Sequence, residues 1–447
     1  MKAVMRKYSE EIYRFALSLS VFLVAVLTGG DTERIAPFAV ALVLLLCIGL
    51  LVLKSAQYLT LLFLHLSLLL IFCYDSFSVF IGYIWLLPVV VVAMAVYLIR
   101  RKPRFLVGAS FWPLVAVSAA TLLGGIGMIS ATDYFRPASL VFMAGLGPGL
   151  ILSYWIMKNE LATPEARKSL LRDLLYWGMT ASAIVFWYIV PIMVKARAIF
   201  GFEPMQWGNN ISTMLMLALP AALAQKRREW WHYAIIAIMF VATLLAGSRG
   251  SVLFVGMELL ACCLWAWRTE DDYVKRLWNR TYFIYAAMAV GYLLSLVIYN
   301  TVAAGLINES EQRWQLFLRS LENFRENPLF GSGIGYRGNA DLYNGKQGTI
   351  NWYHMFVPQI VGGLGIGGIL AWGYQLLVRA RLSARAWRER DFGFALSYLG
   401  LLLMSMVNPG EFCPVPYAFL AVCCFAALEN SHGAPNKKGA ASLDAAP

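Results

Sequence analysis

Arg249, Arg313 and His354 are the residues of this sequence with the clearest potential for chemistry. Arg249 lies in the apolar run LLAGSRGSVLF, residues 244–254, and His354 lies in NWYHMF just before another apolar run. An arginine near hydrocarbon is costly, so it either reaches the membrane interface or serves a function. Guanidinium groups bind phosphate oxygens bidentately, and an imidazole accepts protons near neutral pH. Brought together, these side chains would suit binding of a lipid-linked diphosphate and removal of a proton from a hydroxyl group.

The composition places these residues in a membrane protein. Of 447 residues, 60% are hydrophobic and 14% are charged, and the mean hydropathy is +0.64. Apolar stretches long enough to cross ~30 Å of hydrocarbon recur along the chain, and they lack the alternation of β-barrel strands. We therefore predict an all-α, polytopic integral membrane protein. Its transmembrane helices, about fourteen in number, are predicted at residues 12–29, 35–53, 57–74, 77–99, 105–129, 138–157, 174–194, 211–225, 231–247, 251–267, 281–303, 355–378, 392–409 and 416–428.

The basic residues predict the orientation, because Lys and Arg are retained on the cytoplasmic side. With the N-terminus inside, most of the 37 Lys and Arg residues fall in cytoplasmic loops, including clusters at 100–104 and 379–390. The C-terminus is then cytoplasmic as well. This asymmetry accounts for the net charge of +12 without a nucleic-acid partner. It also places Arg249, Arg313 and His354 at the outer face of a cytoplasmic (inner) membrane.

The first apolar run lacks the small-residue cleavage site of a signal peptide, so we interpret it as a retained helix. The cysteines form no disulfide framework and no CxxC pattern. The predicted parts of the chain are 1–194 with helices one to seven, a core at 195–380 with outer loops 195–210 and 304–354, the last helices at 381–429, and a disordered cytoplasmic tail at 430–447.

The outer loop at 304–354 is far longer than an ordinary helix connection, and such loops tend to be functional. Its first part carries Trp314, Phe317, Leu318 and Leu321 at helical spacing, which predicts an amphipathic helix that lies in the outer interface. Asn308 or Ser310 could cap this helix, and Asn327-Pro328 would end it. The sequence GSGIG follows; it is either a flexible turn or a phosphate-binding loop.

Several further residues are candidates for substrate contacts or for a structural role. Glu258 is the one acidic residue deep in a predicted helix. It either pairs with another group inside the bundle or takes part in the chemistry. We see no outward D-x-D or His/Asp cluster, so we expect neither a metal nor another cofactor. The candidates for diphosphate or sugar binding are Arg197, Asn209 and Asn210 in the loop at 195–210, and Trp352 and Tyr353 beside His354.

These motifs together resemble the O-antigen ligase and O-antigen polymerase superfamily, whose members commonly have twelve transmembrane helices. The resemblance extends over roughly residues 195–380. It rests on SRG at 248–250, the pair Arg313-Trp314, GNNISTMLMLALP at 208–220, ENPLFGSGIG at 326–335 and NWYHMFVPQIVGGLGIGGIL at 351–370.

The resemblance implies a metal-independent, inverting glycosyltransferase. Arg249 and Arg313 would bind the diphosphate of an undecaprenyl-diphosphate-linked glycan, and His354 would accept the proton of the incoming sugar hydroxyl. The acceptor would be another glycan, a lipid A core as in lipopolysaccharide, or another surface molecule. A ligase, a polymerase and a protein-directed oligosaccharyltransferase all fit, and a transporter or flippase of lipid-linked sugars is the alternative from a different class.

Overall fold

The protein is known from a computed structural model. It describes residues 2–53, 55–72, 82–83, 85–128, 134–196, 208–224, 228–246, 248–303, 308–343, 352–388, 392–413 and 415–432. All regular elements in these ranges are helices, as the sequence predicts. Arg197 lies outside the described residues, and so does most of the tail at 430–447.

Each of the fourteen predicted spans overlaps one helix or two consecutive helices in the described ranges. Five helical stretches are long and apolar enough to cross a membrane, and five shorter apolar helices accompany them in the described ranges. The number of crossings therefore stays a prediction. The helices are α1 (Lys2–Thr28), α2 (Thr32–Val52), η1 (Ala56–Leu59), α3 (Thr60–Phe72), α4 (Leu86–Arg101), α5 (Phe111–Leu123), α7 (Pro137–Leu146), α8 (Pro148–Glu160), α9 (Pro164–Ala196), α10 (Gly208–Leu223), α11 (Trp230–Leu245), α12 (Arg249–Thr269), α13 (Tyr273–Ala303), α14 (Asn308–Glu326), η3 (Ala340–Tyr343), α15 (Phe356–Arg388), α16 (Gly393–Met404), η4 (Gly410–Phe412) and α17 (Val415–His432).

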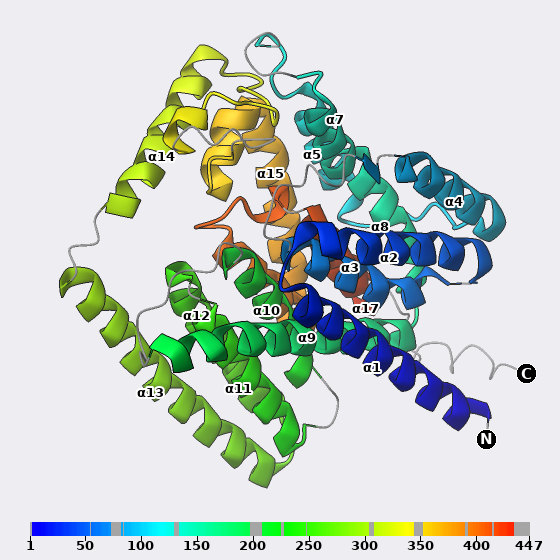
Figure 1. Ribbon diagram of the computed structural model, residues 1–447, viewed down its shortest axis with the longest axis vertical. Helices are drawn as coiled ribbons and strands as arrows, with labels where there is room; N and C mark the ends of the chain where they lie inside the picture. Colours follow the sequence, from blue (N-terminus) through cyan, green and yellow to red (C-terminus); the bar gives the residue numbers. More distant parts are fainter. Residues whose placement is uncertain are drawn as a thin grey trace, which may run out of the picture.

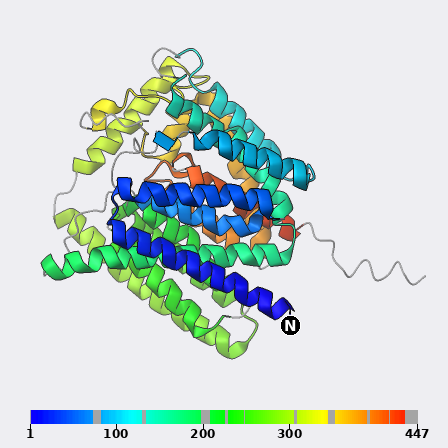
Figure 2. The same ribbon diagram turned by 45° about the vertical axis from the view of Figure 1, so that its right-hand side comes forward.

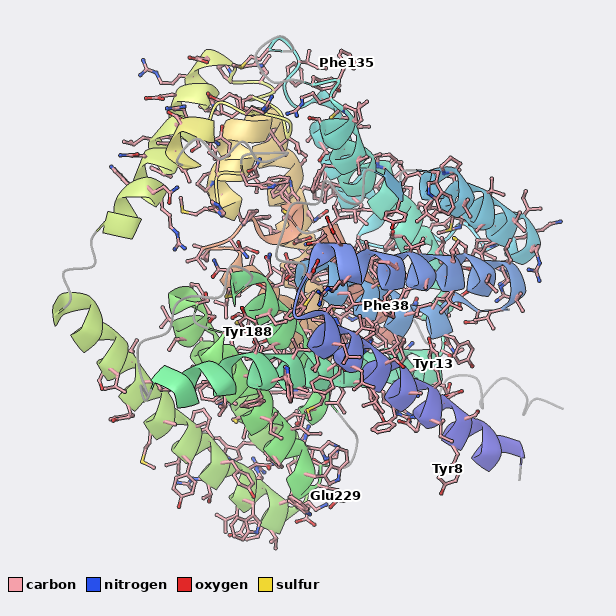
Figure 3. All side chains as sticks on the ribbon, viewed as in Figure 1. Tyr8, Tyr13, Phe38, Phe135, Tyr188 and Glu229 are labelled. Carbon is pink, nitrogen blue, oxygen red and sulfur yellow. The ribbon has the colours of Figure 1, made fainter. Side chains whose placement is uncertain are left out.

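Large apolar side chains are exposed on the surface of this bundle, and Figure 3 draws them as sticks. Tyr8 is 66% exposed, Phe38 48% and Phe135 68%. A soluble protein rarely leaves so many large apolar groups in water. The long apolar helices and this apolar surface together identify an integral membrane protein, whose outer side chains contact lipid.

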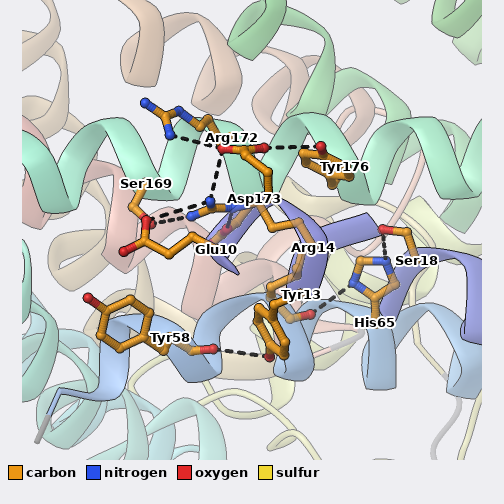
Figure 4. A network of polar contacts seen from close by, with 12 residues as sticks. Glu10, Tyr13, Arg14, Ser18, Tyr58, His65, Ser169, Arg172, Asp173 and Tyr176 are labelled. Carbon is orange, nitrogen blue, oxygen red and sulfur yellow. Dashed lines mark hydrogen bonds and ion pairs between the residues drawn. The ribbon is translucent and has the colours of Figure 1, made fainter. Parts of the chain in front are cut away.

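A buried ion pair fastens α1 to the start of α9 (Figure 4). The Arg14 guanidinium donates hydrogen bonds to Asp173 at 2.8 Å and to Ser169 at 2.6 Å. Glu11 adds an ion pair to Arg172 at 3.0 Å. Arg14 and Asp173 are almost completely buried, so removing either partner would leave a buried charge uncompensated.

A second buried ion pair fastens the end of α17 to the end of α8. Glu429 accepts hydrogen bonds from Lys158 at 2.8 Å and from Tyr154 at 2.6 Å. Only a short turn separates the end of α8 from the start of α9, which holds α1. The start of α1 and the end of α17 therefore lie at the same face of the bundle.

Glu258 is completely buried in α12 and lies against Gly400 of α16. A Cβ atom at Gly400 would come within 2.4 Å of Glu258 Oε1, so only glycine leaves room for this side chain. Neither carboxyl oxygen has a hydrogen-bond partner among the described residues. A carboxylate ionised in such a place would carry a large desolvation cost.

Candidate active site

His354 lies two residues before α15 begins at Phe356, at the end of the long connection from α14. Its φ angle is 53°, and Lys102 is the other described non-glycine residue with a positive φ. An L-residue with a side chain rarely adopts this left-handed conformation, and its occurrence is concentrated at functional sites. The backbone strain at His354 supports its selection as a candidate catalytic residue.

The two aromatic residues before His354 hold its segment in place. Tyr353 is 1% exposed, and its hydroxyl bonds to the Asn323 amide of α14 and lies 3.2 Å from Ser332 Oγ. Trp352 is 9% exposed and meets Phe142 edge-on, with 5.2 Å between ring centroids. This burial leaves little ring surface for a sugar, so both residues act here as anchors. Sugar stacking on them stays a prediction that their burial does not support.

The glycine-rich sequences at 326–335 and 362–368 pack backbone against backbone. The N–H groups of Ser332 and Gly333 donate to the carbonyls of Gly362 and Gly363, at 2.8 and 2.7 Å. A Cβ atom at Gly331 would come within 2.5 Å of the opposing backbone. The N–H groups of Ser332 and Gly333 are therefore bonded within the protein rather than free for a phosphate, and this part of GSGIG packs too closely to be a flexible turn. It is a rigid contact between the connection and α15.

Gly365 of α15 also takes part in this close backbone packing. Its φ of 62° interrupts the helix, and a Cβ atom there would come within 2.5 Å of the Pro328 carbonyl. The connection from α14 is thus fixed to α15 close to the start of that helix. In the sequence, His354 lies between the two packed segments, 326–335 and 362–368.

Arg313 lies in the first half of α14 and is half-buried. Its positive charge acts on the His354 imidazole. Burial and, second, this neighbouring charge lower the pKa of His354 from 6.5 to about 4. Arg313 therefore lies near enough to His354 for its charge to act on the imidazole, and the lowered pKa makes His354 neutral at pH 7, as a proton acceptor must be. The catalytic roles of both residues stay predictions.

The pKa of His354 should depend on Arg313 but not on Arg319 of the same helix. We expect His354 to titrate near pH 4, and the Arg313→Gln substitution to raise that pKa because it removes a positive charge. Histidine NMR on the protein, which has four histidines, measures this, with the resonance assigned through His354→Asn. Arg319→Gln is the matched control, because Arg319 pairs instead with Asp341 at 3.0 Å. An unchanged pKa in Arg313→Gln would separate Arg313 from the site.

The α14 helix forms where the sequence predicts it, from Asn308 to Glu326, and lies beside α15 in both views (Figure 1, Figure 2). Leu316 and Ser320 are completely buried on its inner side, whereas Trp314, Leu318 and Leu321 are exposed. An exposed apolar face suits a helix that lies in a membrane interface. Its position in the outer interface stays a prediction.

Arg249 is the first residue of α12, and the structure describes its backbone but not its side chain. The preceding Ser248 caps α12 by accepting a hydrogen bond from Ser251 N at 3.4 Å. The Ser248 hydroxyl also donates to the side-chain oxygen of Asn209, at the start of α10. Asn209 thus fixes the turn that carries Arg249. Asn210 accepts a hydrogen bond from the Tyr417 hydroxyl at 2.5 Å through its backbone carbonyl.

A segment that was not predicted from the sequence joins the two halves of the candidate site. Residues 405–413, between α16 and α17, lie between the start of α12 and the start of α15 (Figure 1). Ser405 accepts a hydrogen bond from Phe356 N at 3.0 Å. Val407 lies so close to Gly250 that a Cβ atom there would meet it at 2.8 Å. This joining segment therefore contacts the neighbours of both His354 and Arg249.

The predicted span 392–409 was too long, because α16 ends at Met404. Pro409 and Gly410, with a φ of 65°, form the turn instead. Within this turn Asn408 is 5% exposed, and its amide nitrogen has no hydrogen-bond partner in the described ranges. The composition of the turn, NPGEFCP, was the only signal in the sequence that could have drawn attention to it.

A buried ion pair holds the joining segment. Glu411 accepts hydrogen bonds from Arg379 of α15 and, at 3.0 Å, from the Tyr398 hydroxyl of α16. Arg379 is 3% exposed. Arg379 was predicted among the cytoplasmic basic residues at 379–390, and this prediction is wrong, because the residue is buried inside the bundle.

The described residues contain no group of three His, Cys, Asp or Glu side chains close enough to hold a metal ion. Their cysteines, at positions 47, 262, 263, 413, 423 and 424, are all free thiols. Independence of a metal stays a prediction.

Comparison with known proteins supports the resemblance found in the sequence. None of the curated proteins compared with this chain matches it. The family model described as O-antigen ligase matches residues 234–373, a range that contains Arg249, Arg313 and His354. This family groups membrane enzymes of glycosyl transfer in polysaccharide biosynthesis. The chain therefore carries an O-antigen ligase-like domain at residues 234–373, which includes the strained histidine and both arginines.

Proposed function

We propose that this protein transfers a glycan from undecaprenyl diphosphate to an acceptor hydroxyl at the outer face of the cytoplasmic membrane, as an O-antigen ligase or polymerase. The observation that carries the proposal is the left-handed backbone of the buried His354 at the start of α15, where the charge of Arg313 reaches its imidazole. The joining segment 405–413 connects this place to the helix start that carries Arg249.

In the proposed reaction the acceptor oxygen attacks the anomeric carbon of the first sugar, and the bond from that carbon to the diphosphate breaks. The acceptor proton passes to the neutral His354 imidazole. Arg249 and Arg313 bind the diphosphate and stabilise the negative charge that grows on it, so no metal is required by the charge balance. Attack from the face opposite to the leaving group inverts the anomeric centre.

The bound donor would also change the pKa of the His354 imidazole, which acts as the base. A diphosphate beside His354 favours the protonated imidazole and raises its pKa from about 4 towards neutrality. A base whose pKa lies near the working pH is the more effective one. His354 would thus become a stronger base when the donor is present.

Arg249→Ala should reduce transfer by about two to three orders of magnitude, the usual effect of removing a charge-stabilising group. Arg249→Lys should recover little, because an ammonium group cannot form two parallel hydrogen bonds to phosphate. Transfer is measured in membranes that contain equal amounts of each variant. Arg34→Ala is the control, because Arg34 is 70% exposed and lies in a predicted outer loop. Normal transfer by Arg249→Ala would remove this residue from the site.

Deletion of the gene distinguishes a ligase from a polymerase. Long polymer that accumulates on undecaprenyl diphosphate and never reaches the surface identifies a ligase. Single repeats already attached to the surface acceptor identify a polymerase. An unchanged glycan profile would contradict both and favour a transporter or flippase.

A further inference from the structure

The turn between α16 and α17 contains a side chain whose hydrogen-bonding groups are left unused by the fold. Asn408 is 5% exposed, and its amide nitrogen is buried without a hydrogen-bond partner in the described ranges. Its amide oxygen makes no hydrogen bond in these ranges either, but unlike the nitrogen it is not fully buried. An unpaired buried donor costs free energy, and most folded proteins avoid it. A role outside the fold would explain why this amide is kept.

The place of this amide sets it apart from other buried polar groups. Most of the other buried side chains with an unpaired polar atom lie within helices, among them Gln375 of α15 and Ser397 of α16. Asn408 lies instead in the joining segment 405–413, which contacts the neighbours of both Arg249 and His354. Its unused hydrogen bonds are therefore found at the candidate active site.

Close packing holds Asn408 from both sides. Val407, the residue before it, packs on Gly250 near the start of α12, where a Cβ atom would meet it at 2.8 Å. Two residues after Asn408, a Cβ atom at Gly410 would come within 3.3 Å of the Phe356 ring at the start of α15. The amide is thus fixed in position, and a group that is already ordered loses little entropy when it binds a ligand.

The surroundings of Asn408 favour an anion. Val407 and Gly250, which contact each other, are the direct sequence neighbours of Asn408 and Arg249. Because consecutive Cα atoms are only ~3.8 Å apart, one diphosphate could contact both the Arg249 and the Asn408 side chain. The first N–H groups and the dipole of α12, a helix of 21 residues, add partial positive charge at this place.

A small rotation makes the amide nitrogen accessible to a ligand. The last side-chain torsion of asparagine has broad and roughly two-fold preferences. A half-turn about the Cβ–Cγ bond of Asn408 therefore moves the nitrogen to the position of the oxygen, which is not fully buried. No hydrogen bond within the described ranges has to break for this movement.

We propose that Asn408 is a further donor-binding residue, whose side-chain amide donates a hydrogen bond to a diphosphate oxygen of the glycan donor beside Arg249. This inference rests on the proposed function, because its ligand is the diphosphate of that reaction. The hydrogen bond forms only when the donor is bound, so it contributes to affinity rather than to the stability of the empty protein. It also stabilises the negative charge that grows on the diphosphate as this group leaves.

Binding of undecaprenyl diphosphate, without a glycan, to the purified full-length protein tests the proposal. Asn408→Leu keeps nearly the shape of the side chain but removes the amide. It should weaken binding about tenfold or more, the usual effect of losing a hydrogen bond to a charged group. Its thermal unfolding temperature without ligand should equal or exceed that of wild type, because no hydrogen bond of the empty protein is lost. Asn408→Ala should weaken binding to the same extent.

Asn279→Leu is the matched control. Asn279 is 3% exposed in α13, but its amide accepts a hydrogen bond from the Tyr233 hydroxyl and donates one to the Ala266 carbonyl at 3.2 Å. This variant should unfold at a lower temperature than wild type and should bind undecaprenyl diphosphate with unchanged affinity. Asn408→Leu should show the reverse pattern, which a merely structural asparagine would not produce.

Wild-type affinity in both Asn408→Leu and Asn408→Ala would overturn the proposal, because the amide would then make no contact with the diphosphate. The proposed transfer reaction would be unaffected by that result. If the wild-type protein itself does not bind undecaprenyl diphosphate, the proposed function fails together with this inference. The wild-type measurement therefore tells the two failures apart.

Discussion

Substitution of His354 by asparagine is expected to reduce transfer by a factor of about 10² to 10⁴, the usual contribution of a general base. Asparagine is the sharpest choice because it tolerates the left-handed backbone conformation that His354 adopts at a φ of 53°. It therefore removes the imidazole with little change in the fold. The measurement is the amount of transferred glycan per unit of membrane-inserted protein.

A second variant separates chemistry from structure at this position. His354→Ala also removes the base, but it adds the backbone strain of an alanine at positive φ, so its protein level should be equal to or below that of His354→Asn. Both should be inactive. Near-normal transfer by His354→Asn would show that the imidazole takes no proton, and the proposed mechanism would then fail.

Removal of one partner of the Arg379–Glu411 pair is the substitution with the largest expected effect on stability. Both side chains are at most 3% exposed, so Arg379→Met leaves the Glu411 carboxylate buried without a counter-charge. Breaking such a pair typically costs about 3–5 kcal/mol. We expect the thermal unfolding temperature of the purified protein to fall sharply, and transfer to fall with it because Glu411 holds the joining segment.

The double variant Arg379→Met with Glu411→Leu should recover most of the lost stability, since no buried charge remains. Arg319→Met is the matched control: its partner Asp341 is more than half exposed, and a surface pair of this kind contributes less than ~1 kcal/mol. If Arg379→Met unfolds at the wild-type temperature, the pair has no structural role.

The helices were predictable because apolar length and helical periodicity are local properties. The amphipathic pattern from Trp314 to Leu321 located α14, and the Asn-Pro pair after it located its end. The predicted helix boundaries were wrong where tertiary contacts decide where a helix ends. The span predicted at 392–409 ran through Met404, because Val407 is as apolar as a helix core but packs on Gly250 in a turn.

The candidate site was predictable in part for a similar reason. An arginine or histidine in an apolar context stands out from the sequence alone, which is how Arg249, Arg313 and His354 were found. The burial of Tyr353 and the role of Asn209 at Ser248 depend on partners remote in the sequence. No spacing rule reveals such partners, and the aromatic pair before His354 was therefore assigned to sugars rather than to the fold.

The position of the joining segment has a consequence for biosynthesis. The ribosome completes Arg249, Arg313 and His354 well before it reaches Ser405, so a nascent chain that ends after α15 contains all three residues. It lacks the segment that contacts both Gly250 and Phe356, and it lacks Glu411 as the counter-charge of Arg379. Such a chain would insert into the membrane with an unassembled site, which keeps the enzyme inactive until its final two helices have been inserted.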